Sequence, residues 1–106
     1  MVKPKVSEAE LLRDVIKLAR MCGYRVHHCR PAQIRSGRWV TPIQGDPGFP
    51  DLVLAKRDDI LFAELKVDSG KLTEAQQDWH HVTDSIIWRP KDWLSGEIER
   101  TLRDMP

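Results

Sequence analysis

The centre of the chain is residues 51–67, whose sequence is DLVLAKRDDILFAELKV. Residues 51–55 are apolar after their first position and predict a buried strand, and residues 60–67 predict the next strand. The polar residues 56–59 between them predict a tight turn. The segment therefore predicts a β-hairpin.

Three charged side chains fall at the open end of this hairpin. Side chains alternate across a strand, so Glu64 and Lys66 are expected on one face and Leu65 on the other. The midpoint between Asp51 and Glu64 lies inside the predicted turn, so these two carboxylates are expected close together. Two carboxylates raise each other's pKa unless a cation lies between them.

Two interpretations of these charges stay open. In the first, Asp51 and Glu64 bind a hard divalent cation such as Mg²⁺, which prefers oxygen ligands. This arrangement suits phosphodiester hydrolysis, because the metal activates a water and Lys66 offsets charge on the phosphate. In the second, Glu64 and Lys66 form a structural ion pair and Asp51 caps a turn.

The segment before the hairpin predicts a helix, a strand and a loop. Ser7 and Glu10 have the spacing of a capping box, and apolar residues then recur at helical spacing until Gly23. Residues 24–28 predict a short strand. Residues 30–50, rich in Gly and Pro, predict a long loop of the kind that is often functional.

The segment after the hairpin predicts a second helix, a last strand and a final helix. Residues 73–76 have the sequence TEAQ, another capping box, and that helix is expected to reach about Val82. Residues 85–89 predict a strand, which Pro90 breaks. A short helix is expected from about residue 96 to 103. The order is helix, strand, strand, strand, helix, strand, helix.

Composition favours one ordinary domain. The 106 residues suit a single unit, residues 1–106, with 41% apolar and 31% charged residues. No apolar run approaches the roughly 18 residues of a membrane span, and the N-terminus lacks a secretory signal, so we expect a cytoplasmic protein without a membrane partner. Cys22 and Cys29 lack the spacing of a zinc or redox motif and are expected to be reduced thiols.

Charge is unevenly distributed along the chain. The net charge is +1, but residues 13–38 hold seven Lys or Arg against a single acidic residue, Asp14. Such a block can attract phosphate even when the whole chain is nearly neutral. The alternative is a solvated helix face and loop.

Residues 45–54 (GDPGFPDLVL) and 62–66 (FAELK) together resemble the VRR-NUC family, a branch of the PD-(D/E)XK nuclease superfamily with stand-alone members in bacteriophages. The resemblance covers nearly the whole chain and includes Ser7-Glu8, residues 23–26, residues 70–73, Gln76, Trp79, residues 88–90 and Asp92-Trp93. It implies an α/β fold with a restriction-endonuclease-like core, in which helices flank a small mixed β-sheet on both sides.

The resemblance also implies roles for individual residues. Asp51 and Glu64 would be metal ligands, with the backbone carbonyl of Leu65 as a third, and Lys66 would be the catalytic lysine. The cofactor would be Mg²⁺ or Mn²⁺, with no small-molecule cofactor.

Two further residues are implied at the site, each with a simpler alternative. Gln76 matches a glutamine that faces the active site in many such nucleases, although capping its own helix would also explain it. Glu8, on the first helix, would complete the site through metal or water. Glu10 is more readily explained as a capping residue.

Contacts with DNA are expected from the basic loop and the strand before it. Trp79, Trp88 and Trp93 are expected in the core or an interface. Trp39 is the better candidate for touching nucleic acid. The full set of candidate DNA-binding residues is His28, Arg30, Arg35, Arg38 and Trp39.

The implied activity is a metal-dependent, structure-selective DNA endonuclease. Stand-alone members of the family are expected to be homodimers that cut Holliday junctions or related branched DNA. A flap or fork nuclease would use the same site, and a non-catalytic DNA-binding or assembly module would share the fold. One departure concerns the segment between Trp79 and Trp88, which is shorter than the family suggests and puts local packing and the dimer in doubt.

Overall fold

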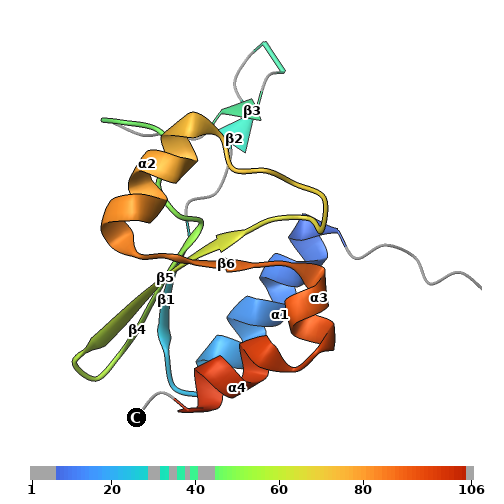
Figure 1. The fold of residues 1–106 in the computed structure, drawn as a ribbon, viewed down its shortest axis with the longest axis vertical. Helices are drawn as coiled ribbons and strands as arrows, with labels where there is room; N and C mark the ends of the chain where they lie inside the picture. Colours follow the sequence, from blue (N-terminus) through green and yellow to red (C-terminus); the bar gives the residue numbers. More distant parts are fainter. Residues whose placement is uncertain (1–6, 29–31, 34–35, 38, 41–44, 105–106) are drawn as a thin grey trace, which may run out of the picture.

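The structure of the chain is a computed structural model, which describes residues 7–28, 32–33, 36–37, 39–40 and 45–104. Figure 1 shows the elements in their spatial arrangement. In chain order they are α1 (Glu8–Met21), β1 (Arg25–His28), β2 (Ala32–Gln33), β3 (Trp39–Val40), β4 (Leu52–Lys56), β5 (Asp59–Leu65), α2 (Glu74–Thr83), β6 (Ile86–Trp88), α3 (Pro90–Leu94) and α4 (Glu97–Asp104).

The main sheet has four strands in the order β1-β4-β5-β6. The β1–β4 and β4–β5 pairs are antiparallel, and the β5–β6 pair is parallel. A parallel pair needs a crossover, which here runs through α2. The sheet is therefore mixed, and the predicted fold class is confirmed.

The hairpin register agrees with the prediction. Leu52 lies opposite Ala63 and Lys56 opposite Asp59. One further step along this register places Asp51 opposite Glu64. The predicted end of the second strand was wrong by two residues, because β5 ends at Leu65 and Val67 is 38% exposed.

One face of the sheet forms the core. Its strands contribute Leu52, Leu54, Ala63, Leu65 and Trp88, all buried. They pack against buried residues of α1 and α4, namely Leu11, Val15, Ala19, Ile98 and Leu102. Trp88 thus occupies the core position that the sequence indicated. Tyr24 belongs to the same core, and its hydroxyl donates a hydrogen bond of 3.0 Å to the Leu102 carbonyl.

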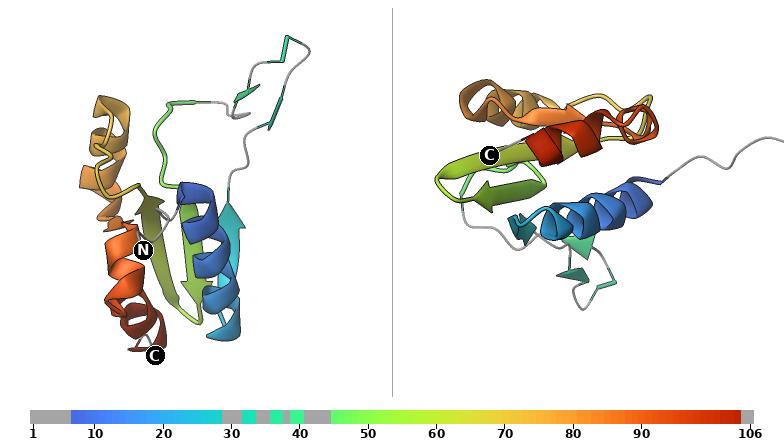
Figure 2. Two further views of the ribbon diagram at one scale, coloured as in Figure 1. Left: turned by 90° about the vertical axis from the view of Figure 1, so that its right-hand side faces the viewer. Right: turned by 90° about the horizontal axis from the view of Figure 1, so that it is seen from below.

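The other face of the sheet carries α2, which lies on the opposite side from α1 (Figure 2). Phe62 of β5 contacts Phe49 edge to face at 5.8 Å between ring centroids, and Phe49 contacts Trp79 of α2 at 5.0 Å. This aromatic cluster fixes the chain just before Asp51 against both the sheet and α2. Trp79 therefore has the packing role that was expected.

Two predictions about the connections were incomplete. The loop expected over residues 30–50 contains a two-stranded antiparallel sheet of β2 and β3. Pro90 does end the last strand, but it also begins α3, which the sequence analysis missed. Proline is favoured at the first position of a helix, and the Asp92 carboxylate caps this start by accepting from the Arg89 N–H at 2.8 Å.

The short segment between Trp79 and Trp88 is accommodated by an abrupt end to α2. Asp84 caps the helix in the left-handed conformation, with φ of 52°. His80 Nδ1 and Ser85 Oγ lie 2.8 Å apart and tie the end of the helix to the start of the next strand. Within the ranges given above, no helix combines the length and apolar character needed to cross a membrane.

Candidate active site

The open end of the hairpin brings Asp51 across to β5. Its Oδ2 accepts a hydrogen bond of 2.8 Å from the Leu65 N–H. This bond extends the strand pairing by a side chain, and it holds the carboxylate in one orientation at the end of the sheet. Asp51 itself is half-buried.

Glu64 is a buried carboxyl, with a side chain only 4% exposed. Burial, the negative charge of Asp51 and a hydrogen bond between the two carboxyl groups raise its pKa to about 8. The positive charge of Lys66 acts in the opposite direction. At neutral pH Glu64 therefore keeps its proton, which lies in the hydrogen bond to Asp51. A cation between the two carboxyl groups could replace that proton.

Lys66 follows β5 directly, and its backbone N–H donates to the Trp88 carbonyl at 3.0 Å. Its positive charge offsets part of the rise in the pKa values of Glu64 and Glu8. Among the described residues, the ion pair within 4.0 Å is Arg103–Glu99. The structural Glu64–Lys66 pair that the sequence left open is therefore not formed.

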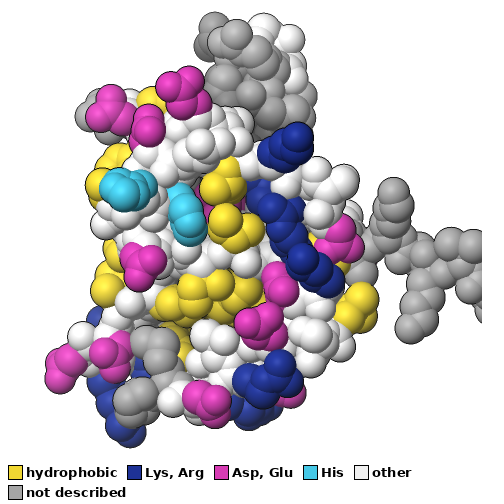
Figure 3. All heavy atoms as spheres, viewed as in Figure 1, with side chains coloured by type: hydrophobic (Ala, Val, Ile, Leu, Met, Phe, Trp, Pro, Cys, Tyr) yellow, Lys and Arg dark blue, Asp and Glu magenta, His cyan; other side chains and the backbone are white. Residues whose placement is uncertain are grey.

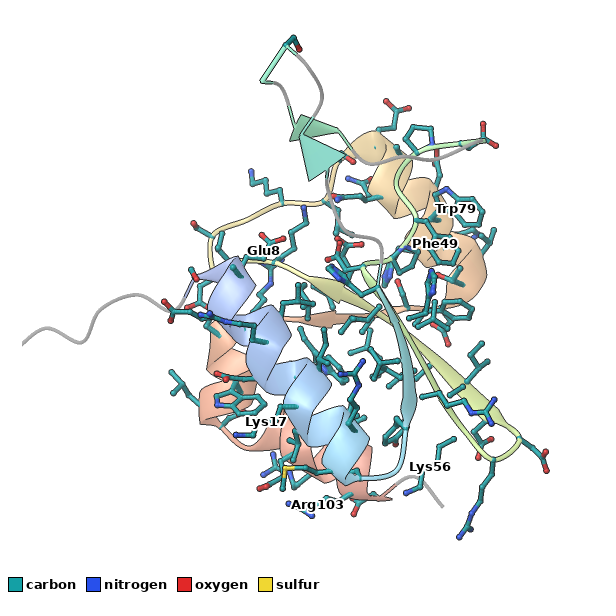
Figure 4. The ribbon with its side chains drawn as sticks, turned by 180° about the vertical axis from the view of Figure 1, so that it is seen from behind. Glu8, Lys17, Phe49, Lys56, Trp79 and Arg103 are labelled. Atoms are coloured by element: carbon teal, nitrogen blue, oxygen red, sulfur yellow. The ribbon has the colours of Figure 1, made fainter. Side chains whose placement is uncertain are left out.

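Glu8 lies at the start of α1, on the side of the fold where β5 ends (Figure 4). The residue is exposed overall, yet burial of its carboxyl group and the negative charge of Asp51 raise its pKa. Glu10 is exposed, and its N–H donates to Ser7 Oγ at 3.1 Å. The first helix thus brings Glu8 toward the carboxylate pair and leaves Glu10 at the cap.

Gln76 combines the two roles that were weighed for it. Its Oε1 accepts from the Thr73 N–H at 2.9 Å, which completes the capping box of α2. Its Nε2 donates a longer hydrogen bond of 3.4 Å to Glu64 Oε1. Since the helix cap fixes one end of the amide, the other end is held toward the buried carboxyl.

Two supporting residues were missed by the sequence analysis. Gly48 has a φ of 98°, and a Cβ there would lie 2.5 Å from the Ala75 backbone, so the loop before Asp51 rests on the first turn of α2. Arg89 donates from its guanidinium to the Val67 and Gly70 carbonyls, both at 2.7 Å. This clamp fixes the turn that follows Lys66. The sequence held two hints to these residues. Gly48 lies between two prolines, and Arg89 is the last residue of the strand predicted over residues 85–89.

The predicted DNA-binding residues are only partly placed. His28 is half-buried at the end of β1, opposite Leu52. Trp39 belongs to β3, but its side chain is outside the described part of the chain, as are Arg30, Arg35, Arg38 and Cys29 entirely. Cys22 is a free thiol.

The donor set at the site suits a hard cation. Across the described ranges, no group of three or more His, Cys, Asp or Glu side chains is arranged to hold a metal ion. A zinc site with three or four protein ligands is therefore not built there. Mg²⁺ needs only one or two carboxylates because it keeps several waters, and the Asp51–Glu64 pair meets that need.

No family model, no curated protein and no solved structure matches this chain. The functional proposal therefore depends on the arrangement of Asp51, Glu64 and Lys66.

Proposed function

We propose that this protein is a metal-dependent endonuclease that hydrolyses DNA phosphodiester bonds. The observation that carries the proposal is the hydrogen bond between the Asp51 and Glu64 carboxyl groups, with the positive charge of Lys66 acting on Glu64. Within the described part of the chain, Lys66 takes part in no ion pair closer than 4.0 Å. The resemblance to the VRR-NUC family agrees with this site.

Asp51 and Glu64 would hold Mg²⁺ or Mn²⁺, with the Leu65 carbonyl as a third ligand and Glu8 reaching it through water. When bound, such an ion stabilises negative charge on a phosphate and lowers the pKa of a water. The buried carboxyl of Glu64 beside the half-buried Asp51 fits this group, because a divalent cation offsets the repulsion between two carboxylates.

Neighbouring groups of the protein hold the two carboxyl groups in position for a cation. The Leu65 N–H donates to Asp51 Oδ2 and holds this carboxylate beside Glu64. The Gln76 amide donates to Glu64 Oε1 and holds this carboxyl group in place. Carboxylate ligands bind a metal in their deprotonated form, so the Glu64 proton would be released when the ion binds.

Lys66 supplies the second part of the chemistry. Its ammonium is a compact positive charge with three donors, and it would orient the attacking water and offset the charge that develops on the phosphate. Because the Arg89 clamp fixes the turn after Lys66, its backbone needs no reorganisation when substrate arrives.

Branched DNA is the proposed substrate, and the proposed active form is a homodimer. A two-fold dimer places two equivalent sites on one junction, and the family resemblance favours that assembly. A flap or fork nuclease would use the same residues and differ only in substrate.

The test is cleavage of a labelled four-way junction, a flap, a fork and a plain duplex, each with Mg²⁺ or Mn²⁺ at low salt. Paired symmetric nicks in the junction, lost in Lys66→Ala, would support the full proposal. Cleavage of flaps or forks alone would support the active site and reject the four-way junction as its substrate. Binding without cleavage of any substrate would favour a non-catalytic DNA-binding module.

A further inference from the structure

The outer side of α1 carries a stripe of positive charge. Arg13, Lys17 and Arg20 recur at spacings of four and three residues, so they share one side of the helix. All three are exposed. They border a groove of about 800 Å³ whose opposite wall is β1, and the residues lining it are Arg13, Ile16, Lys17, Arg20, Met21, Val26, His27 and His28.

The cations of this stripe make no close ion pair with an acidic side chain of the described residues. In the part of the chain that the structure describes, none of Arg13, Lys17 and Arg20 takes part in an ion pair. Uncompensated cations along one groove attract a polyanion and raise its local concentration. The groove is therefore suited to a ligand with repeated negative charge.

Apolar side chains lie between the cations. Met21 is 72% exposed at the end of α1, and Ile16 and Val26 are half-buried in the groove walls. A nucleic-acid strand alternates charged phosphates with largely apolar sugar faces, and this mixed lining matches both. An acidic peptide would match the positive charge of the groove but not its apolar side chains.

Both walls of the groove lead to the candidate active site. Figure 4 shows Glu8 at the start of α1 and Lys17 farther along the same helix. On the other wall, His28 ends β1 opposite Leu52, the residue after Asp51. A second group of Lys and Arg side chains gathers over the loop between β5 and α2, on the face shown in Figure 3. Positive charge thus reaches the site from two directions.

We propose that the groove between α1 and β1 binds the sugar–phosphate backbone of DNA next to the bond that is cut. This inference rests on the proposed nuclease function and adds the surface that holds its substrate. Arg13 and Arg20 are about 10 Å apart along the axis, at 1.5 Å per residue. One DNA strand has a phosphate about every 3.4 Å of axis, so the stripe spans about three phosphates.

The experiment measures DNA binding separately from cleavage. A fluorescein-labelled four-way junction is titrated with protein in EDTA, and anisotropy is recorded between 50 and 200 mM salt. The variant is Lys17→Ala/Arg20→Ala. The matched control, Arg57→Ala/Arg100→Ala, removes the same charge from two exposed arginines at the hairpin turn and on α4.

We expect the groove variant to lose about tenfold in affinity per removed phosphate contact at 50 mM salt, or roughly a hundredfold. The slope of log K against log salt should fall by about 2, since each contact contributes about 0.9. The control should lose less than about threefold, with an unchanged slope.

Three outcomes would overturn the inference. The first is a groove variant that binds as tightly as wild type, with the same salt slope. The second is wild-type protein that binds no DNA. The third is poly-glutamate displacing the labelled junction as well as unlabelled DNA does at equal charge. If DNA binding depends on the groove but neither Mg²⁺ nor Mn²⁺ supports cleavage, the result supports the groove as a DNA-binding surface and contradicts the nuclease proposal.

Discussion

Replacing Glu64 by glutamine should make the protein's stability much less sensitive to alkaline pH. Burial beside Asp51 raises the pKa of Glu64 from 4.5 to about 8. The folded state therefore holds a proton that the unfolded state releases between these two pH values. Stability from this group is fully present below pH 4.5, and it is lost as pH rises toward 8.

The magnitude follows from the size of the shift. Each pKa unit corresponds to about 1.36 kcal/mol, so ionising Glu64 costs the folded protein on the order of 5 kcal/mol. A small domain has a total stability of roughly 5–15 kcal/mol, so this loss is a large fraction of it. Glu64→Gln keeps the size of the side chain and cannot ionise.

The assay is urea unfolding followed by tryptophan fluorescence in EDTA, at pH 5 and pH 8.5. We expect the unfolding free energy of wild type to fall by several kcal/mol more than that of Glu64→Gln. Glu10→Gln is the control, because this exposed residue lies on α1 and should behave as wild type. Adding Mg²⁺ at pH 8.5 should restore wild type and leave Glu64→Gln unchanged. Equal pH dependence in wild type and Glu64→Gln would refute the reasoning.

Substitutions of Gly48, Arg89 and Gln76 test the supports of the site, and Gly45→Ala and Thr73→Ala are controls. Gly48→Ala should lower the unfolding free energy by about 1–3 kcal/mol from backbone strain alone, and by more because its Cβ meets the Ala75 backbone at 2.5 Å. Gly45→Ala, which has a similar positive φ but open space, should cost less in the same urea measurement. Arg89→Ala should cost about 1.5–3 kcal/mol per lost charged hydrogen bond, and faster proteolysis at the turn after Lys66 should report its release. Gln76→Ala and Thr73→Ala should each cost about 1 kcal/mol of helix capping. Only Gln76→Ala should also slow single-turnover cleavage, and equal slowing by both would remove Gln76 from the site.

The central hairpin was predictable because its determinants are local. Apolar runs predict the two strands, and the short polar turn between them sets their register. The Asp51–Glu64 contact follows from that register alone. The Thr73–Gln76 capping box was visible for the same reason, since its partners are three residues apart.

The supports of the site depend on contacts between distant segments. Arg89 reaches carbonyl groups that are 19 and 22 residues away in sequence. Part of the need for glycine at position 48 arises when α2 packs on the loop before Asp51, because a Cβ there would lie 2.5 Å from the Ala75 backbone. Neither contact leaves a periodic signal in the sequence.

The ends of elements were the least predictable feature. Pro90 is equally compatible with the end of a strand and the first turn of a helix. Here β6 ends at Trp88 and Pro90 begins α3, whose start Asp92 caps. The β2–β3 pair involves only two residues in each strand, which is too short for a periodic pattern.

The measurement that tests the central claim most directly is nicking of supercoiled circular DNA as a function of Mn²⁺ concentration. Wild type is compared with Asp51→Asn and with Lys66→Ala, after circular dichroism has shown that all three are folded. The account predicts nicking by wild type that depends on the metal and disappears in EDTA, with at least a hundredfold loss of rate in each variant. Nicking that persists in EDTA, or that survives in both variants, would contradict a metal-dependent nuclease site at Asp51, Glu64 and Lys66.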